Sequence, residues 1–574
     1  MRRRKKLEDR RQETGDRRKS SCLLPSAFCL PPAVVVVSLG ALLVAVAPLV
    51  GQSTAPQIES IRMADLKADV FFLASDEMRG RLANSPENRL AAGFIRSRFE
   101  RSGLKPAGTN RSYFQVFQLT NFKLGADNRL TVAARGREVA AGQLGEDFFP
   151  ESFSATGTVE GGVVYVGFGI TAPALNHDDY RAADARGKVA LVLNHEPGES
   201  DPHSPFDGEV ASEFARPLRK ALYAQQHGAR AVLFVTDIHN HPDRRSLKGA
   251  MRTEWPAEPQ RLEGAALTDW VDQVRIPVVQ VSPEFADRLL QPAGKRLSDV
   301  AQQAEAGGGV TPVPLAGVEV RVAAAIERTP LDVQNVLGLV EGSDPLLKND
   351  WVIVSAHFDH TGAEATRTFN GADDNASGVA GVLEVAEAYA RAESQGFRPR
   401  RSILLAGWNA EERGLLGAWA FTERPPVPLE RVIAVLNMDM IGRDEEVPAD
   451  GGTRFTGLDP QTAASNHNAV NVMGYSRSSD LRQATELANR SIGLDLRFRY
   501  DNNRSNLLRR SDQWPFLFRG VPAIFLHTGL HPDYHTERDR PEKLNYEKME
   551  RIVRLVYQMS WNLADAPERP RVNP

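Results

Sequence analysis

Histidine and carboxylate side chains follow a series of apolar segments in the second half of the chain. The segments are WVIVSA, SILLAGW, VIAVLN and PAIFLH, and the polar residues beyond them include His357, Asp359, Asp373, Glu411, Glu412, Asp439 and His535. Imidazole and carboxylate groups without a thiolate suit zinc, or another divalent ion of similar size, in a catalytic role. The group offers five plausible ligands, two histidines and three carboxylates. If one carboxylate is shared, five ligands can serve two ions that together activate a water molecule for hydrolysis.

The apolar segments themselves predict how these side chains are brought together. Residues 351–356, 402–408, 432–437 and 522–527 are continuous apolar runs, as expected for strands buried on both faces. The residues after Asn375 have apolar side chains at a helical period. Alternating strands and helices predict an α/β fold with a mostly parallel sheet, helices on both faces, and ligands bound beyond the carboxyl ends of the strands. Each polar group alone could be a helix cap or ordinary surface sequence, but their position at successive strand ends favours one shared site.

The first half of the chain contains segments with different sequence patterns. Residues 61–102 have helical periodicity, with Pro86 placed to start a second helix. Further on, short β-rich runs separated by Gly, Pro and Asp clusters predict a small domain with few helices. We therefore expect the N-terminal part of a catalytic domain and a linker at 56–150, an inserted domain at 151–315, and the rest of the catalytic domain at 316–574.

Residues 1–55 have the features of a targeting segment. Residues 2–19 carry ten basic and four acidic side chains, and residues 33–50 are almost unbroken apolar sequence ahead of a small, polar stretch. This order is typical of a signal peptide, and the apolar run is also just long enough to be an uncleaved membrane anchor. We expect an exported protein, periplasmic or extracellular, that is either free or anchored by residues 33–50.

The remainder of the chain is mildly acidic and lacks cysteine. The net charge is −3, so the +6 balance of residues 2–19 leaves −9 for everything after them. This balance argues against nucleic acid as the main partner. The two cysteines, Cys22 and Cys29, both lie in the leader, so neither a disulfide framework nor a cysteine metal site is expected in the folded part.

Five motifs in order resemble the co-catalytic zinc aminopeptidases of metallopeptidase clan MH, whose relatives include bacterial leucyl aminopeptidases and glutamate carboxypeptidases. The motifs are AHFDH, GADDNASG, NAEERGLLG, NMDM and PDYHTERDRPEKL. The resemblance covers about residues 60–115 and 330–565. The segment 151–315, with VVYVGFGI and DDYRAADARGKVALVL, resembles the protease-associated domain that is often inserted in this family.

The resemblance implies two zinc ions with assigned ligands, although other divalent metals are possible occupants. His357 and Asp439 would hold one ion, Glu412 and His535 the other, and Asp373 would bridge them. The family often has a cis peptide after the bridging aspartate, which places it at Asp373–Asp374.

The resemblance also implies catalytic roles. Glu411 would be the general base and acid, and Asp359 would accept a hydrogen bond from the far nitrogen of His357 and fix its tautomer. Tyr534 matches a tyrosine that stabilises the developing oxyanion in some relatives. His360, His527 and His531 lie near the site and are interpreted as outer or packing residues. A departure occurs at 511–513, where Ser-Asp-Gln stands in place of the family's Ser-Asp-His and puts substrate contacts there in doubt.

The predicted function is hydrolysis of the N-terminal residue of peptides. The alternatives on the same site are a carboxypeptidase or acyl-peptide hydrolase, and less favoured ones are a glutaminyl cyclase or a catalytically dead receptor. Loss of ligands would mark a dead receptor, and none is missing from the sequence. His239 and His241, in the loop DIHNHPDRR, are interpreted as solvated side chains rather than as ligands of a further metal. Substrate preference and oligomeric state are not visible in the sequence.

Overall fold

The computed structural model describes residues 54–573, apart from 135–136, 209, 237–240, 242–245, 259, 263, 306–308 and 310. The predicted leader therefore lies outside the described residues. Within the described part, none of the helices has the length and apolar character needed to cross a bilayer.

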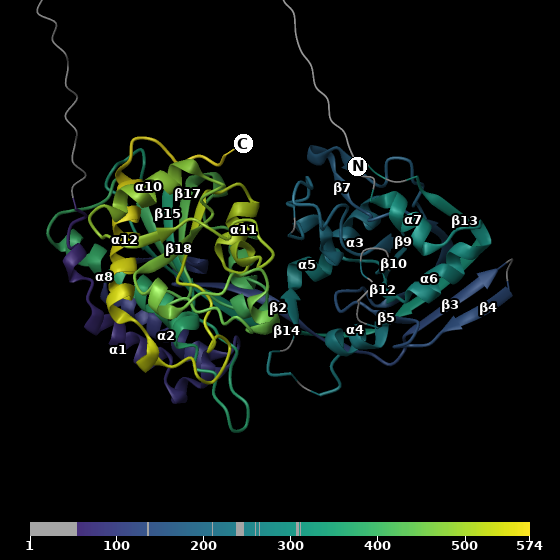
Figure 1. The fold of residues 1–574 in the computed structure, drawn as a ribbon, viewed down its shortest axis with the longest axis horizontal. Helices are drawn as coiled ribbons and strands as arrows, with labels where there is room; N and C mark the ends of the chain where they lie inside the picture. Colours follow the sequence, from purple (N-terminus) through teal and green to yellow (C-terminus); the bar gives the residue numbers. More distant parts are fainter. Residues whose placement is uncertain are drawn as a thin grey trace, which may run out of the picture. The chain divides into compact units, whose positions relative to one another are not determined.

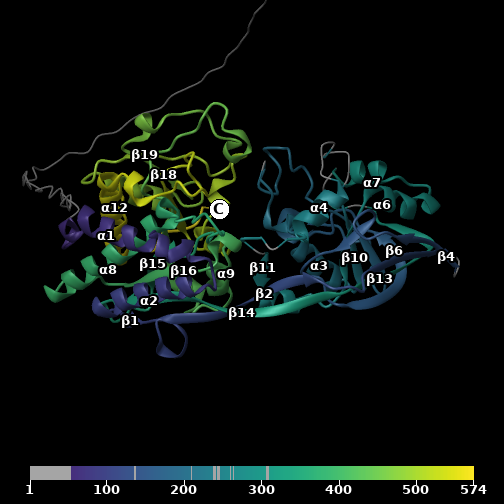
Figure 2. The ribbon, with the colours of Figure 1, turned by 90° about the horizontal axis from the view of Figure 1, so that it is seen from below.

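Ten strands form the sheet that carries the predicted site. They are β1 (Lys105–Pro106), β2 (Phe114–Leu124), β11 (Ala265–Leu267), β14 (Ile326–Val340), β15 (Trp351–His357), β16 (Ser402–Trp408), β17 (Val432–Met438), β18 (Ala469–Met473), β19 (Asp495–Arg497) and β20 (Ala523–His527). Their order is β11-β2-β14-β16-β15-β17-β20-β18-β19, with β1 paired to β14. Strands β16, β15, β17 and β20 are parallel. Strands β2 and β14 run antiparallel, side by side along most of their length (Figure 2). The sheet is therefore mixed with a parallel centre, which confirms the predicted fold class.

Helices cover both faces of this sheet (Figure 1). The helices of this part are α1 (Met63–Leu73), α2 (Pro86–Arg101), α8 (Gly378–Ser394), α9 (Leu416–Glu423), α10 (Ser479–Asn489), α11 (Gln513–Phe518) and α12 (Tyr546–Asp565). Helices α8 and α12 share one buried cluster with the central strands, and α9 and α11 share another. The start of α2 matches the sequence prediction, because Pro86 is its first residue and the Ser85 hydroxyl accepts the Asn88 N–H at 3.0 Å.

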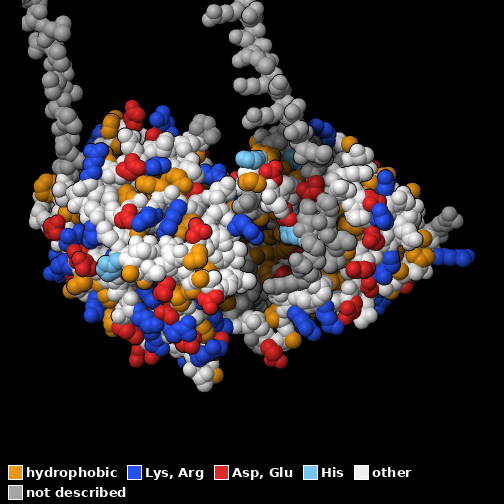
Figure 3. Space-filling model, viewed as in Figure 1, with side chains coloured by type: hydrophobic (Ala, Val, Ile, Leu, Met, Phe, Trp, Pro, Cys, Tyr) orange, Lys and Arg blue, Asp and Glu red, His pale blue; other side chains and the backbone are white. Residues whose placement is uncertain are grey.

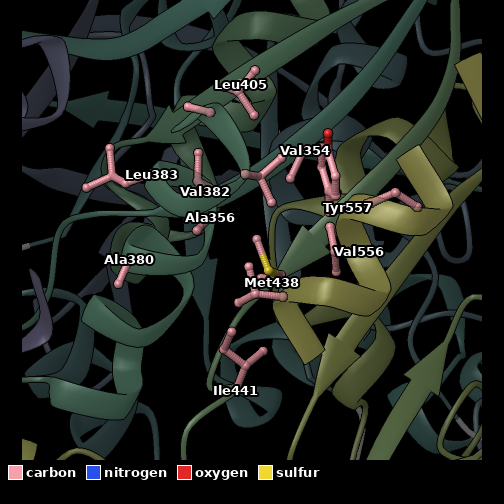
Figure 4. Packing of buried hydrophobic residues seen from close by; sticks show 14 of the residues in the cluster. Val354, Ala356, Ala380, Val382, Leu383, Leu405, Met438, Ile441, Val556 and Tyr557 are labelled. Carbon is pink, nitrogen blue, oxygen red and sulfur yellow. The ribbon is translucent and has the colours of Figure 1, made fainter. Parts of the chain in front are cut away.

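Strand β15 shows why the apolar runs are continuous. Val352, Val354 and Ala356 join the cluster of α8 and α12, whereas Ile353 between them joins the cluster of α9 and α11. Side chains alternate across a strand, so a strand covered on both faces needs apolar residues at every position. Figure 4 shows the first of these clusters, in which residues of the central strands pack against α8 and α12.

A second sheet of eight strands belongs mostly to the middle of the chain. It comprises β3 (Arg129–Ala134), β4 (Arg137–Gly142), β5 (Phe148–Pro150), β6 (Gly157–Tyr165), β9 (Val189–Leu193), β10 (Ala231–Val235), β12 (Val278–Val281) and β13 (Val313–Ala324). The order is β4-β3-β13-β6-β9-β10-β12-β5, and β6, β9, β10 and β12 are parallel. A short pair, β7 (Thr171–Ala172) and β8 (His177–Asp178), lies apart from it.

The structure differs from expectation in this region. Five helices occur here, α3 (Pro217–Gln226), α4 (Leu247–Glu254), α5 (Thr268–Gln273), α6 (Pro283–Leu290) and α7 (Leu297–Ala304), so the prediction of few helices is wrong. Parallel strands need crossover connections, and α3 to α5 lie in those that join β9, β10 and β12. The second sheet also begins at residue 129 and ends at 324, beyond both ends of the predicted insertion. The expected strand at 163–170 stops at Tyr165, because Gly167 and Gly169 have φ of 62° and 64° and turn the chain.

Charged side chains are interspersed on the surface. On the face shown in Figure 3, Lys and Arg alternate with Asp and Glu over both sheet regions, and neither sign forms a continuous field. This distribution agrees with the small net charge.

Candidate metal centre

The parallel strands of the first sheet end in the predicted polar residues. His357 is the last residue of β15, Glu411 and Glu412 follow β16, and Asp439 follows β17. Because these strands are parallel neighbours, their carboxyl ends meet at one edge of the sheet. His535 reaches the same place from the loop after β20.

The converging side chains form two groups. One contains His357, Glu411 and Asp439, and the other contains His360, Asp374, Glu412 and His535. In the first, Nε2 of His357 lies 3.3 Å from Oδ1 of Asp439. In the second, Nε2 of His535 lies 3.2 Å from Oε2 of Glu412. The structure thus brings His357 together with Asp439, and Glu412 together with His535, in the pairs that the sequence resemblance implied.

Asp374, not Asp373, lies between the two groups. One carboxylate oxygen of Asp374 is 3.3 Å from Nε2 of His357, and the other is 2.9 Å from Nε2 of His535. The predicted position of Asp373 is wrong, because its carboxylate accepts the N–H of Gly442 at 2.6 Å and faces His531 at 3.3 Å. The cis peptide is likewise one residue later than expected, at Asp374–Asn375.

The backbone that carries these two aspartates is held by Asp539, which the sequence prediction missed. Both carboxylate oxygens of Asp539 lie 3.0 Å from the N–H of Asp373, and one is 3.1 Å from the N–H of Asp374. Asp539 is fully buried. The signal for Asp539 in the sequence was the motif TERDRPEKL, which contains this residue and directly follows His535.

Asp359 contacts the site differently from the prediction. Its main-chain carbonyl, rather than its carboxylate, is the nearer partner of Nδ1 of His357, at 3.2 Å against 3.8 Å. The carboxylate instead accepts the main-chain N–H groups of Glu411 and Glu412, at 3.1 and 3.4 Å. Asp359 therefore orients the turn that presents both glutamates, and burial raises the pKa of its carboxyl to about 6.

The position of Glu411 and the pKa of its carboxyl are those expected of an acid–base residue. Burial raises the pKa of its carboxyl well above the usual range, and repulsion from Asp439 and Glu412 adds to this rise against the attraction of His357. Glu412 behaves oppositely, since attraction to His535 and His360 overcomes its burial and lowers its pKa to about 2. Two adjacent carboxyl groups with opposite shifts can take separate roles, one as a permanently charged ligand and the other as a proton carrier.

Tyr534 lies beside the site on the wall of a narrow pocket. The pocket is lined by Asp374, Glu411, Asp439, Met440, Leu507, Arg510, Phe525, His527, Leu530 and Tyr534. The ring of Tyr534 stacks on that of His535 at 3.9 Å, and its hydroxyl accepts a hydrogen bond from Arg510 at 3.3 Å. Arg510 is exposed and was missed by sequence reasoning, which had no motif to single it out. A tyrosine hydroxyl and a guanidinium thus face the carboxylates across a pocket with apolar walls.

The three additional histidines have different positions. His360 belongs to the second group, with Nδ1 2.7 Å from Oε1 of Glu412, so it lies closer to the site than its interpretation as an outer residue implied. His531 faces Asp373, and Nδ1 of His527 contacts the carbonyl of Asp439 at 2.9 Å.

Gln513 holds the local fold rather than lining the pocket. Its side-chain oxygen accepts from Asn437 at 3.1 Å, and its amide donates to the carbonyl of Leu508. The neighbouring Asp512 is fully buried, and neither of its carboxylate oxygens has a hydrogen-bond partner among the described residues.

Arg81 connects the loops that carry the site, although it lies far away in the sequence. Its fully buried guanidinium donates to the carbonyls of Phe358, Asn370 and Gly371 at 2.9, 2.8 and 3.0 Å. It also donates to Leu73, which anchors both loops to α1. No spacing argument could have found this residue.

The donor set fits divalent metal ions. Within the described part, several buried atoms lie close to a facing ligand atom without forming a well-aligned hydrogen bond: Nε2 of His357, Oε1 of Glu412, Oδ1 of Asp439 and Nε2 of His535. Leaving such atoms without a partner is costly, and coordination to a cation is the arrangement that satisfies imidazole nitrogens and carboxylates together. Every carboxylate and imidazole that the metal hypothesis requires is present.

Comparison with known proteins shows which family this region resembles. Residues 335–560 match the family model for Peptidase family M28. This part of the chain is therefore similar to the peptidases of family M28, and we call it the M28 domain. The predicted resemblance to zinc peptidases is thereby confirmed at the level of the family, whereas the protease-associated domain stays a prediction.

Proteins similar to this chain are named for several different activities. A probable zinc metalloprotease of Pyrenophora teres f. teres is 28% identical over 42% of this chain and 54% of its own length. A probable glutamate carboxypeptidase of Arabidopsis thaliana is 32% identical over 31% of this chain and 24% of its own. An aminopeptidase of Rattus norvegicus is 26% identical over 50% of this chain and 40% of its own. The matches therefore span less than two thirds of the length of these relatives.

Among solved structures, an aminopeptidase from Aneurinibacillus sp. strain AM-1 aligns over 90% of this chain and 97% of its own. The identity is 18% and the TM-score is 0.46.

Proposed function

We propose that the protein is a zinc-dependent aminopeptidase whose M28 domain holds two ions with Asp374 as the shared ligand. One observation carries the proposal: the two oxygens of Asp374 face one histidine in each of the two groups, His357 and His535. Asp439 would complete the first ligand set and Glu412 the second. This revises the sequence prediction only in the bridging residue.

Different residues of the chain then have different roles in hydrolysis. Zinc ions at this site would polarise the scissile carbonyl and lower the pKa of a water molecule. Glu411 takes the proton of that water and passes it to the leaving amine, which its raised pKa favours. Asp359 keeps Glu411 and Glu412 in place through their main-chain N–H groups. Tyr534, which lines the same pocket, would donate its hydroxyl to the developing oxyanion.

The narrow pocket supports action at a chain end. Apolar Met440, Leu507, Phe525 and Leu530 line it beside the catalytic carboxylates. A free α-amine is a cation at neutral pH, and carboxylates at the mouth of a small apolar pocket would bind it while the pocket takes the first side chain. The predicted leader also makes us propose that the enzyme acts outside the cytoplasm.

Chromogenic aminoacyl substrates and their N-acetylated counterparts, with and without a chelator, test the class of reaction. We expect cleavage only of the free-amine forms and loss of that cleavage on chelation. Cleavage of both forms alike would contradict an aminopeptidase.

Glu411→Gln tests the mechanism. The variant should keep both ions, because the ligands remain, and lose about 10²–10⁴-fold in kcat. Metal content and kcat measured on the same sample check this, and retained turnover would remove Glu411 from the role of base.

A carboxypeptidase is the second candidate, and Arg510 is the observation that favours it. Its guanidinium lines the same pocket and could bind a substrate carboxylate. N-acetylated peptides with a free C-terminal glutamate, added to the substrate panel, distinguish this activity from the first.

A further inference from the structure

Three side chains converge near the carboxyl end of the second sheet, far in the sequence from the M28 motifs. His195 and Glu199 lie in the segment after β9, and His241 lies in the segment after β10. Nδ1 of His195 is 3.1 Å from one carboxylate oxygen of Glu199, and Nε2 of His241 is 2.6 Å from the other. Each imidazole thus faces its own oxygen of a single carboxylate. His239, considered with His241 in the sequence, lies outside the described residues.

Contacts outside the cluster hold its geometry. Lys220 on α3, itself fully buried, donates to the carbonyls of Leu193 and His195. His195 has a φ of 65°, in the left-handed region, which turns its ring away from the strand direction. The N–H of Gly198 donates to Glu305 beyond α7 at 2.8 Å, which fixes the turn that presents Glu199.

The two rings are also held against each other. The centroids of His195 and His241 are 3.9 Å apart, and the ring planes differ by 23°. Two ring nitrogens therefore face one carboxylate from closely stacked rings. When both rings direct their lone pairs inward, a cation between the three groups satisfies all of them.

The donor types select the kind of cation. Two imidazole nitrogens with one carboxylate are a ligand set for zinc, whereas calcium and magnesium prefer oxygen ligands throughout. Donors that share a tetrahedral zinc ion with bonds of about 2.0–2.1 Å lie about 3.3 Å apart. The separation of 3.1 Å between Nδ1 of His195 and Glu199 is close to that value, whereas the 2.6 Å between Nε2 of His241 and Glu199 would have to widen to admit an ion.

We propose that His195, Glu199 and His241 bind a zinc ion, or a similar transition-metal ion, separate from the pair in the M28 domain. Three protein ligands leave a position for water or a ligand, as catalytic rather than structural zinc sites do. His195 lines a cavity of about 600 Å³, which Asn194, Thr236 and Gln280 also line at the ends of β9, β10 and β12. A ligand that enters this cavity could therefore reach the ion.

The zinc content of the full-length protein tests the site. The protein is stripped with a chelator, reloaded with Zn²⁺ and desalted, and zinc is then measured per chain. We expect three ions in the wild type and two in His241→Ala and in the isosteric Glu199→Gln. The matched control is His203→Ala, an exposed histidine of the same region outside the cluster, which should retain three.

The count also separates this site from the M28 pair. Turnover of His241→Ala should equal that of the wild type, because none of the three residues lies among the M28 ligands, and Asp374→Asn should keep one ion after losing the other two. Equal zinc content in the wild type and in both variants would overturn the proposal. So would a wild-type content of two.

Discussion

The two large sheets both end their parallel strands in polar side chains, but they use them in opposite ways. In the first sheet the residues after β15, β16 and β17 are histidines and carboxylates, several of whose buried atoms have no hydrogen-bond partner within the described part. In the second sheet the ends of β9, β10 and β12 carry Asn194, Thr236 and Gln280. These satisfy one another, because the Asn194 amide donates to Thr236 at 2.9 Å and to Gln280 at 3.0 Å.

This difference explains why the ligand residues of the first sheet call for a cation, whereas the amide network beside the His195–Glu199–His241 cluster in the second sheet does not. Amides and hydroxyls have both donors and acceptors, so a few of them can close a network without help. Carboxylates and neutral imidazoles facing one another have an excess of acceptors, and only protons or metal ions can compensate for it. The edge of the first sheet therefore requires a cation, whereas the amide network of the second does not.

The largest expected effect comes from the carboxylate between the two groups. Asp374→Asn should lose two zinc ions per chain and with them all measurable turnover, because the amide offers only one oxygen ligand and cannot be shared by two ions. Zinc content and kcat measured on the same sample check this.

Asp373→Asn is the matched control, one residue away. Its side chain contacts Gly442 and His531 instead of the two groups, so it should keep zinc and lose about 10–100-fold in affinity or activity, as for an outer partner of a metal ligand. The opposite ranking of the two variants would restore Asp373 as the bridge.

Arg81→Lys should give the next largest effect. Lysine keeps the charge but loses the fork that reaches Phe358, Asn370 and Gly371 at once, so the two loops carrying the ligands loosen. We expect zinc affinity to fall by about 10–100-fold, measured by competition with a chromogenic chelator.

Arg89→Lys on α2 is the control, since that side chain is exposed and donates to the nearby carbonyl of Asn84. Equal affinity in both variants would show that Arg81 supports the fold without positioning the site.

The strands and their polar ends could be predicted because both follow from local patterns. Continuous apolar runs mark strands buried on both faces, and His357, Glu412 and Asp439 follow them within four residues in the sequence. The choice between Asp373 and Asp374 could not be made in this way. Neighbouring side chains in an irregular turn point in different directions, and Gly371, with a φ of 58°, sets that turn. Arg81 and Asp539 act through main-chain groups of distant loops, and such contacts leave no periodic signal in the sequence.

A half-buried glutamate in the second region should respond to pH in a way that the metal ligands do not. Burial raises the pKa of Glu151 from 4.5 to about 8, and repulsion from Glu254 adds to the rise. Between these pH values the folded chain binds more protons than the unfolded chain, so this group's contribution to stability is present below pH 4.5 and is lost as pH rises through 8. Glu151→Gln should therefore gain Tm relative to the wild type as pH increases.

The expected gain is on the order of 1 kcal/mol, or about 1 °C for a chain of this length, because Glu151 is partly exposed. Thermal unfolding of the two proteins at pH 5 and pH 8.5 measures it. Glu138→Gln, exposed on β4, should show no such dependence. A Tm difference that does not change with pH would mean that Glu151 ionises freely in the folded protein.

The smallest effect on activity should come from Asn194→Ala, and it tests the comparison of the two sheets most directly. Removing this amide leaves Thr236 and Gln280 without its hydrogen bonds and should cost about 1–3 kcal/mol of stability, with turnover unchanged. Asn437→Ala is its counterpart on β17, where the amide donates to Ser511 and Gln513 just before Asp439. That variant should lose stability and turnover together, since the strand end it holds carries a ligand. If both variants lost turnover equally, the second sheet would contribute directly to the reaction. The proposed difference between the ligand residues of the first sheet and the amide network of the second would then be wrong.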